Sequence, residues 1–243
     1  MRRVKTTLFF LLISLSAFSS DSTKVKTNRF ALGINISPDY CFRTLSNNDG
    51  SQSSNDVINA RNGMEIPKVG YTIGVGLSCA IKKHFSIEIG VNYSNKGYQT
   101  VYQDIFIAPS QVPDPAIPLR FKSRYNFSYV DVPLIAHFQF GKKRLSFIAS
   151  TGVAANLFLF EKAITVKDFG DGNVKKDKGL SNYIYNPINI SPMISLGCNL
   201  KIGKNVTLKL EPVFRYGVLQ IINNPVTGHL WNVGLNIGGY FCF

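Results

Sequence analysis

Six titratable residues lie where ion-pair or acid–base chemistry would need them, on the small and polar face of segments that alternate like strands. They are Glu88, Asp131, His137, Lys209, Glu211 and Arg215. Charges of both signs in a narrow space are expected to pair, because an unpaired buried charge is very costly. We predict that Lys209, Glu211 and Arg215 form one cluster. It is expected to reach across to Asp131 or Glu88, either as a structural plug or as a gated path for ions or protons.

Hydrolytic catalysis would depend on the three histidines. His84 falls in a predicted turn and His137 on the inner face, so only His229 lies near the rim, where a substrate could arrive. No GxSxG elbow or similar nucleophile motif accompanies it. We therefore predict no catalytic residues. A lipid-modifying enzyme with a Ser/His pair or an Asp/His/Ser set stays open as an alternative.

The four cysteines do not form the pattern of a disulfide framework. By strand alternation Cys79 and Cys198 face outward, whereas Cys41 and Cys242 face inward. The inward pair lies at opposite ends of the fold, too far apart for a disulfide. We expect free cysteines that act as small apolar side chains. No CxxC or His-rich spacing is present, so neither a metal nor a cofactor is predicted.

The elements that must position these residues are strands, and residues 231–243 show the pattern best. Every second residue there is large and apolar except Gly239, and the residues between are small or polar except Tyr240. Such faces suit a barrel wall with lipid outside and a filled lumen inside. A soluble barrel or sandwich would instead leave Gly, Ser and Asn in water. The aromatic strand ends, including Phe243, favour the membrane.

The same alternation predicts an all-β fold, an eight-stranded antiparallel up-and-down transmembrane β-barrel. The predicted strands are residues 29–42, 69–81, 85–102, 124–140, 144–160, 188–202, 205–220 and 231–243. A change of alternation near Tyr129 predicts a β-bulge. Short basic turns alternate with longer links, which is typical of an outer-membrane barrel with periplasmic turns and external loops. An even number of strands places both termini in the periplasm.

The longer links are the surface on which recognition would occur. We expect a stiff proline-rich arch, a projecting hairpin and a mobile polar loop at residues 109–118, 163–178 and 44–56. The hairpin is centred on Gly170. Asp168, Asp171 and Asn173 lack the spacing of an EF-hand loop, so turn chemistry explains them better than calcium.

Residues 1–19 have the parts of a signal peptide, with a basic start, an apolar run and small residues at a plausible cut. The apolar run is shorter than the roughly 18 residues that a membrane helix needs. Residues 20–243 are then expected to form one barrel domain. The net charge of +13 lies mostly in turns and loops, which favours contact with water and lipid headgroups rather than nucleic acid.

Two short motifs resemble those of a known family. Residues 129–134, YVDVPL, are similar to the YLEIPLL strand of the PorT-like outer-membrane β-barrel family of Bacteroidota, with Asp131 where that family usually has Glu. Residues 210–217 resemble its late EP..RY element. The resemblance implies an eight-stranded barrel in the outer membrane of a Gram-negative bacterium. It implies no settled activity, although the best-known member assists protein secretion.

The glycine-rich ending is similar to the terminal strand that the barrel-assembly machinery recognises, with Trp231, Phe241 and Phe243 as the signal. We expect a scaffold or interaction protein, and more narrowly an accessory component of protein secretion or envelope assembly. Its expected partners are outer-membrane lipid, the assembly machinery, and envelope or secretion proteins. A narrow channel is less favoured, because side chains fill eight-stranded barrels whereas porins use about 16 to 18 strands.

Overall fold

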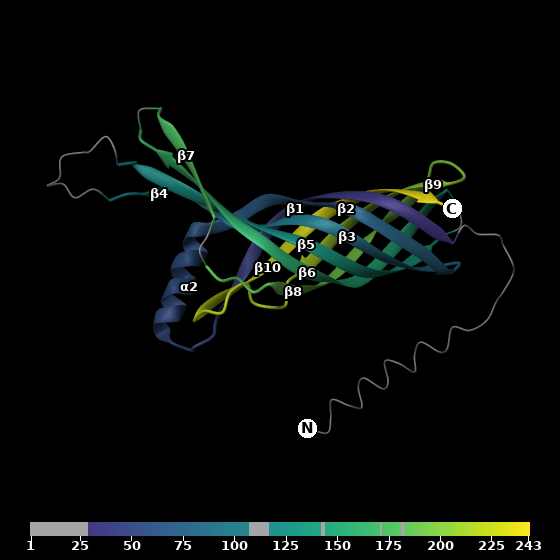
Figure 1. Cartoon of the computed structure of the whole chain (residues 1–243), viewed down its shortest axis with the longest axis horizontal. Coiled ribbons are helices and arrows are strands. Elements are labelled where there is room, and N and C mark those ends of the chain that lie inside the picture. Colours follow the sequence, from purple (N-terminus) through teal and green to yellow (C-terminus); the bar gives the residue numbers. More distant parts are fainter. Residues whose placement is uncertain (1–28, 107–116, 142–143, 171, 181–182) are drawn as a thin grey trace, which may run out of the picture.

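The computed structural model describes residues 29–106, 117–141, 144–170, 172–180 and 183–243. The predicted signal peptide and most of the proline-rich arch lie outside these residues, so both stay predictions. Within the described part, the strands form one continuous sheet that closes on itself (Figure 1). No helix within the described residues is long and apolar enough to span a bilayer.

Eight strands form the barrel, each antiparallel to both of its neighbours. They are β1 (Phe30–Asn47), β2 (Glu65–Lys82), β3 (Phe85–Thr100), β5 (Arg120–Phe140), β6 (Leu145–Asp168), β8 (Ile188–Lys201), β9 (Val206–Tyr216) and β10 (Val226–Cys242). The order around the ring is β5-β3-β2-β1-β10-β9-β8-β6, and pairing of β5 with β6 closes it. The predicted fold class is confirmed.

The two ends of the barrel differ. Short turns join β2 to β3 and β8 to β9 at one end, where Ala31 of β1 also pairs with Cys242 of β10 (Figure 1). We call this the short-turn end. The opposite, long-loop end carries helix α2 (Gln52–Met64) and the short strands β4 (Gln103–Asp104) and β7 (Val174–Leu180), which pair with β5 and β6.

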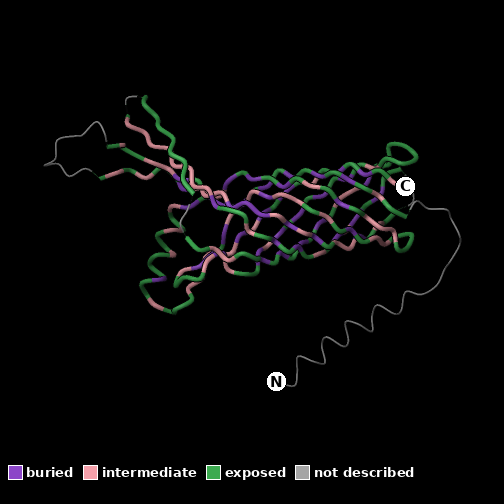
Figure 2. The backbone as a smooth tube through the Cα atoms, viewed as in Figure 1, coloured by how far each residue is buried: buried purple, intermediate pink, exposed green. Residues whose placement is uncertain are grey.

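Alternation along each strand separates an apolar outer face from a polar inner face. On β1, Leu32, Ile34 and Ile36 are exposed, whereas Ser37 and Asp39 are buried. The colours of Figure 2 alternate in this way along the barrel wall. Lipid contact requires apolar residues outside, and the lumen then forms a polar core.

Two glycines on the inner face leave room for longer side chains. A Cβ atom at Gly234 would overlap the carboxylate of Asp39 and the hydroxyl of Ser37. A Cβ atom at Gly33 would overlap the ring of Tyr240. The small residues of the inner face therefore leave room for the long side chains that extend from neighbouring strands.

The strands continue beyond the predicted limits at the long-loop end. β5 begins at Arg120 rather than near residue 124, and β6 continues to Asp168 rather than 160. With β7 paired along β6, these extensions form a three-stranded ribbon that projects past the barrel (Figure 1). The predicted hairpin is its tip, where Gly170 has a φ of +83°, a conformation that favours glycine.

The β-bulge predicted near Tyr129 is present at the base of this ribbon. Ser128 pairs with Phe160, and Tyr129 pairs with Phe158, so one extra residue, Leu159, lies on β6. The irregularity is therefore in the partner strand rather than in β5 itself. An extra residue of this kind bends the strand and increases its twist.

The prediction of a mobile loop at residues 44–56 is wrong. β1 continues to Asn47, and α2 begins after Ser51, whose hydroxyl accepts a hydrogen bond from the backbone N–H of Ser54 at 3.1 Å. The side chain of Asn47 donates to the carbonyl of Ser51 at 2.9 Å. Ser, Asn and Asp favour turns, but the same side chains also cap helices, and here they cap α2.

Candidate functional site

Near the short-turn end, polar side chains cross the lumen around the carboxylate of Glu88 on β3. Lys209 Nζ donates to Glu88 Oε2 at 3.0 Å, and Tyr240 Oη donates to Glu88 Oε1 at 2.9 Å. His137 Nε2 lies 3.1 Å from Glu88 Oε2. One carboxylate thus contacts side chains from β5, β9 and β10.

A second carboxylate, that of Glu211 on β9, extends this arrangement. Ser150 Oγ and Ser195 Oγ donate to Glu211 Oε1 at 2.7 and 3.1 Å. Ser150 Oγ also lies 2.7 Å from His137 Nδ1, which joins the two carboxylates into one system. We call it the Glu88 network; its members are Glu88, His137, Ser150, Ser195, Lys209, Glu211 and Tyr240. They come from β3, β5, β6, β8, β9 and β10, which are six of the eight barrel strands.

Deeper in the barrel, Asp39 of β1 is the centre of another cluster. Arg215 Nη1 lies 3.2 Å from Asp39 Oδ1, and Thr72 Oγ1 donates to Asp39 Oδ2 at 2.6 Å. Ser37 Oγ donates to Oδ1 at 2.7 Å. The carboxylate is fully buried, so the guanidinium of Arg215 and two hydroxyls replace its water.

A third cluster surrounds Asp131 of β5. Lys96 Nζ lies 3.1 Å from Asp131 Oδ2, and Asn156 Nδ2 donates to Asp131 Oδ1 at 2.6 Å. Ser191 Oγ donates to Asn156 Oδ1 at 2.5 Å. With the two clusters above, every barrel strand contributes a side chain to a polar cluster in the lumen.

The structure divides the predicted cluster between different depths of the lumen. Lys209 and Glu211 lie together, with Lys209 Nζ 3.9 Å from Glu211 Oε2 and closer to Glu88. Arg215 does not join them and pairs with Asp39. The reason is the rise along β9: four residues separate Glu211 from Arg215, which is roughly 13 Å. Asp131 likewise pairs with a different cation, Lys96.

Asp39 and Lys96 were missed by the sequence analysis, although a signal for both was present. Asp39 continues the inner-face series of β1 after Asn35 and Ser37, and Lys96 continues that of β3 after Ser94. Both lie inside the predicted strands. Following the alternation to the end of each strand would have placed them in the lumen.

Ser150, His137 and Glu88 form a hydrogen-bonded series that resembles the arrangement of a hydrolase. The hydroxyl of Ser150, however, donates its hydrogen bond to Glu211 at 2.7 Å. Both Ser150 and His137 are buried among lumen side chains. The series is therefore best explained as part of the packing of the Glu88 network.

The other two histidines lie apart from this series. His84 is in the turn after β2, with Nδ1 3.0 Å from the carbonyl of Gln139. His229 lies at the long-loop end, where its ring stacks on Tyr216 with a centroid distance of 6.0 Å. Its Nδ1 is 3.2 Å from the carbonyl of Gly217. His84 and His229 thus each contact a backbone carbonyl.

At the mouth of the barrel, Glu65 binds two arginines. Arg43 Nε and Arg61 Nε each donate to its carboxylate at 2.6 Å. Helix α2 supplies Arg61 and also Asn62, which accepts from Arg43 Nη1 at 2.6 Å. Burial is the largest single effect and lowers the pKa of the Arg61 guanidinium, but the hydrogen bond to Glu65 and the charge interactions with Glu65 and nearby tyrosines together raise that pKa above its ordinary value. The trio carries a net positive charge.

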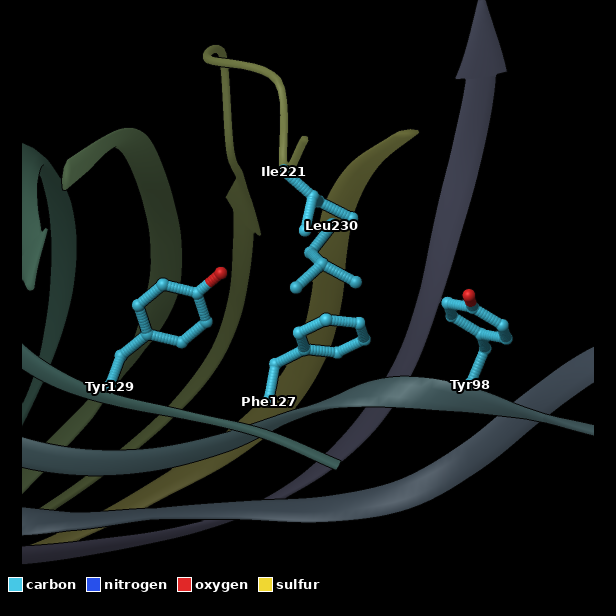
Figure 3. Close-up of a cluster of buried hydrophobic side chains, with 5 residues drawn as sticks. All are labelled: Tyr98, Phe127, Tyr129, Ile221 and Leu230. Atoms are coloured by element: carbon cyan, nitrogen blue, oxygen red, sulfur yellow. The ribbon is translucent and has the colours of Figure 1, made fainter. Parts of the chain in front are cut away.

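On the lumen side of this trio, aromatic and aliphatic side chains close the lumen near the long-loop end. Figure 3 shows the ring of Phe127 beneath Leu230 and Ile221, with Tyr129 and Tyr98 on either side. A cavity of about 280 Å³ lies between this cluster and the charged trio. Its lining includes Arg43, Arg61, Glu65, Tyr98, Tyr125 and Tyr185. The volume is near the lower limit for small-molecule pockets.

All four cysteines are free thiols, with Cys41 buried and the other three partly exposed. Across the ranges that the structure describes, no group of three or more His, Cys, Asp or Glu side chains is placed to hold a metal ion.

A family model described as outer membrane protein beta-barrel domain matches residues 18–223. The chain belongs to this family. As an outer-membrane barrel, it has its place in the outer membrane of a Gram-negative bacterium. No curated protein matches the chain.

The comparison with solved structures finds other outer-membrane proteins at low sequence identity to this barrel. Neisserial surface protein A is 13% identical, with 88% of this chain and 97% of that one covered and a TM-score of 0.41. Ail, the attachment invasion locus protein of Yersinia pestis, is 12% identical, with 86% of this chain and 97% of that one covered and a TM-score of 0.31. The outer membrane protease OmpT of Escherichia coli is 7% identical, with 93% of this chain and 100% of that one covered and a TM-score of 0.41.

The outward apolar side chains of the outer-membrane barrel mark the depth that lipid reaches. On β6 they run from Leu145 and Phe147 to Leu159 and Phe160, all exposed. Lys162 follows as the first cation on this strand. We therefore assign the part of β6 beyond Phe160 to the region outside the hydrocarbon.

The tip of the ribbon holds an ion pair outside the membrane. Arg120 Nε and Nη2 donate to Asp168 Oδ2 at 2.9 and 2.7 Å, and the backbone N–H of Gly170 donates to Oδ1 at 3.0 Å. The Gly170 hydrogen bond, followed by that of Arg120, holds the pKa of the Asp168 carboxyl below its ordinary value. The stabilisation is present above the ordinary pKa and is lost as the pH falls through the lowered one.

Arg120→Gln is expected to move the pKa of Asp168 back towards its ordinary value, because one of its two main hydrogen-bonding partners loses its charge. The ¹³C shift of the Asp168 carboxyl carbon during acid titration measures this. Lys122→Gln, which removes a nearby cation on the same strand, is the matched control. Equal midpoints in the two variants would contradict the assigned role of Arg120.

Proposed function

We propose that this outer-membrane barrel is a non-catalytic scaffold that presents a recognition surface at its long-loop end, outside the cell. The observation that carries the proposal is the Glu88 network, in which side chains from six strands bind one another across the lumen. A lumen filled in this way suits a fixed support, because satisfied polar networks make a core rigid. The surface left for a partner consists of α2, the mouth cavity and the ribbon.

The narrower proposal is an accessory role in protein secretion or envelope assembly. It is supported by the resemblance of residues 129–134 and 210–217 to the PorT-like motifs. In this proposal the short-turn end, with the ends of β1 and β10, lies in the periplasm. The alternation of short turns and long loops supports that orientation.

Extraction in mild detergent, co-purification and mass spectrometry test the proposal. The wild-type chain is compared with a variant in which residues 166–178 are replaced by a short Asn-Gly turn. The ribbon lies outside the closed ring, so this variant should still form a barrel, as its migration on a detergent gel before and after boiling would show. We expect envelope proteins that accompany the wild-type chain and are reduced or lost with the variant.

Other outcomes would support a different function. Discrete conductance steps of the wild-type protein in a planar bilayer would favour a narrow channel over a plugged scaffold. A mass shift in the outer-leaflet lipid after deletion of the gene would favour a lipid-modifying enzyme. Recovery of the protein alone, without either activity, would contradict a role in a complex.

A further inference from the structure

The register of the ribbon gathers cations on one of its two faces. In antiparallel strands, paired residues point to the same face, and so do residues two apart along one strand. Val166 of β6 pairs with Lys176 of β7 and with Lys122 of β5. Two residues closer to the barrel, Ile164 pairs with Lys178 and Arg124. Lys162 comes next on the same face. We call Lys122, Arg124, Lys162, Lys176 and Lys178 the cationic face.

These five cations lack acidic partners. Within the described ranges, no carboxylate lies within ion-pair distance of any of them, and Arg124 donates only to the amide oxygen of Gln99, at 3.2 and 3.3 Å. The carboxylates of this face, Asp104 and Asp168, flank Arg120 at the tip. The cationic face therefore keeps its positive charge.

The opposite face of the ribbon is different. There Lys167 binds Asp177 with an N–O distance of 2.7 Å. Each face also has one lysine over an aromatic ring: Lys175 Nζ lies 5.3 Å from the centre of the Phe169 ring, and Lys122 Nζ of the cationic face lies 4.6 Å from that of Tyr102. Most of the free positive charge of the ribbon is thus on one side, a property of the register rather than of composition alone.

The cationic face continues the lipid-facing wall of the barrel. Phe160, exposed on the outer wall, and Lys162 are two residues apart on β6 and share a face. Each further row of cations lies roughly 7 Å along the strand from the one before. The headgroup layer outside the hydrocarbon is roughly 5–8 Å thick, so Lys162 lies at its level. Figure 1 shows that the ribbon leans away from the barrel axis, so that it extends sideways beyond the barrel wall, on the side where the membrane surface lies.

We propose that the cationic face binds the phosphate groups of the outer-leaflet glycolipid, so that the ribbon is anchored on the membrane surface. The proposal rests on the orientation given under the proposed function, with the long-loop end outside. Phosphate oxygens match the fork of an arginine and the point charge of a lysine. The cationic face lies directly beyond the apolar wall of the barrel. This position favours a membrane lipid, rather than a soluble polyanion, as the source of the phosphate groups.

The binding experiment uses the full chain folded in neutral detergent and the diphosphorylated outer-leaflet glycolipid as the probe. Native mass spectrometry measures the lipid bound per barrel over a titration. The test variant carries Lys122→Gln, Arg124→Gln, Lys176→Gln and Lys178→Gln. The control variant loses the same charge elsewhere, through Lys83→Gln, Lys175→Gln, Lys201→Gln and Lys204→Gln. Both variants are first checked for heat-modifiable migration on a gel.

We expect the test variant to bind the glycolipid several hundredfold more weakly, since each of the four cations removed contributes about fivefold near an anionic surface. The control variant is expected to bind like the wild type. Equal affinity of the two variants, or undiminished binding of the same lipid after its phosphates are removed, would overturn the proposal. Equally tight binding of soluble polyphosphate would overturn the assignment to lipid. If the test variant lost its partner proteins but still bound the glycolipid, this inference would be contradicted, whereas the proposed scaffold function would not.

Discussion

Arg215→Glu is expected to prevent folding of the barrel, or to lower its free energy of unfolding by at least about 3–5 kcal/mol. In the wild-type protein, Arg215 Nη1 lies 3.2 Å from the fully buried carboxylate of Asp39. The variant would place a second carboxylate against the first, and the hydroxyls of Ser37 and Thr72 cannot compensate for both charges. The fraction of heat-modifiable protein on a detergent gel and the midpoint of urea unfolding measure the loss.

Arg120→Glu is the matched control for this charge reversal. Arg120 also pairs with an aspartate, Asp168, but it lies on the exposed ribbon. Exposed ion pairs contribute about 0–1 kcal/mol, so the control should fold almost as well as the wild type. If Arg215→Glu instead folded normally and left the conductance unchanged, the lumen cluster would not be a structural plug.

Glu88→Gln is expected to destabilise the barrel by about 3 kcal/mol. The substitution removes the charge that Lys209 Nζ meets at 3.0 Å, and the next carboxylate, Glu211, is 3.9 Å away. The buried ammonium would then be only partly compensated. Equilibrium unfolding in urea, read from the folded fraction on gels, measures the change.

A double-mutant cycle with Lys209→Met gives this prediction its control. Replacing both partners of a buried ion pair is often far less costly than removing one, because no charge is left alone. We expect Glu88→Gln/Lys209→Met to be more stable than the sum of the two single losses predicts. Strictly additive losses would show that Glu88 and Lys209 do not stabilise the barrel as a pair.

The sequence predicted the ring of strands because the membrane imposes a strict alternation on each one. Residues 231–243 alternate large and small almost without exception, and all of them except Phe243 lie in β10. Beyond the membrane this constraint ends. Residues 164–168 of β6 and the whole of β7 are therefore not distinguished from a loop by alternation, which is why the ribbon was predicted only as a hairpin.

The lumen residues could be predicted as a set but not as pairs. Alternation decides that Glu211 and Arg215 both face inward, but their partners depend on how far each neighbouring strand is displaced along the barrel. That stagger brings Asp39 to the level of Arg215 and Glu88 to that of Lys209. Helix α2 was missed for another reason, because its polar sequence carries a cap but almost no apolar stripe.

The pairing of β1 with β10 has a consequence for the order of events during folding. These two strands are joined from Ala31 and Cys242 to Asn47 and Val226. The seam cannot form until the final strand has been synthesised and delivered, because its two sides are almost the whole chain apart. We therefore expect this seam to close late during insertion. A chain that lacked β10 would keep an open edge beside Asp39 and would have no means of closing it.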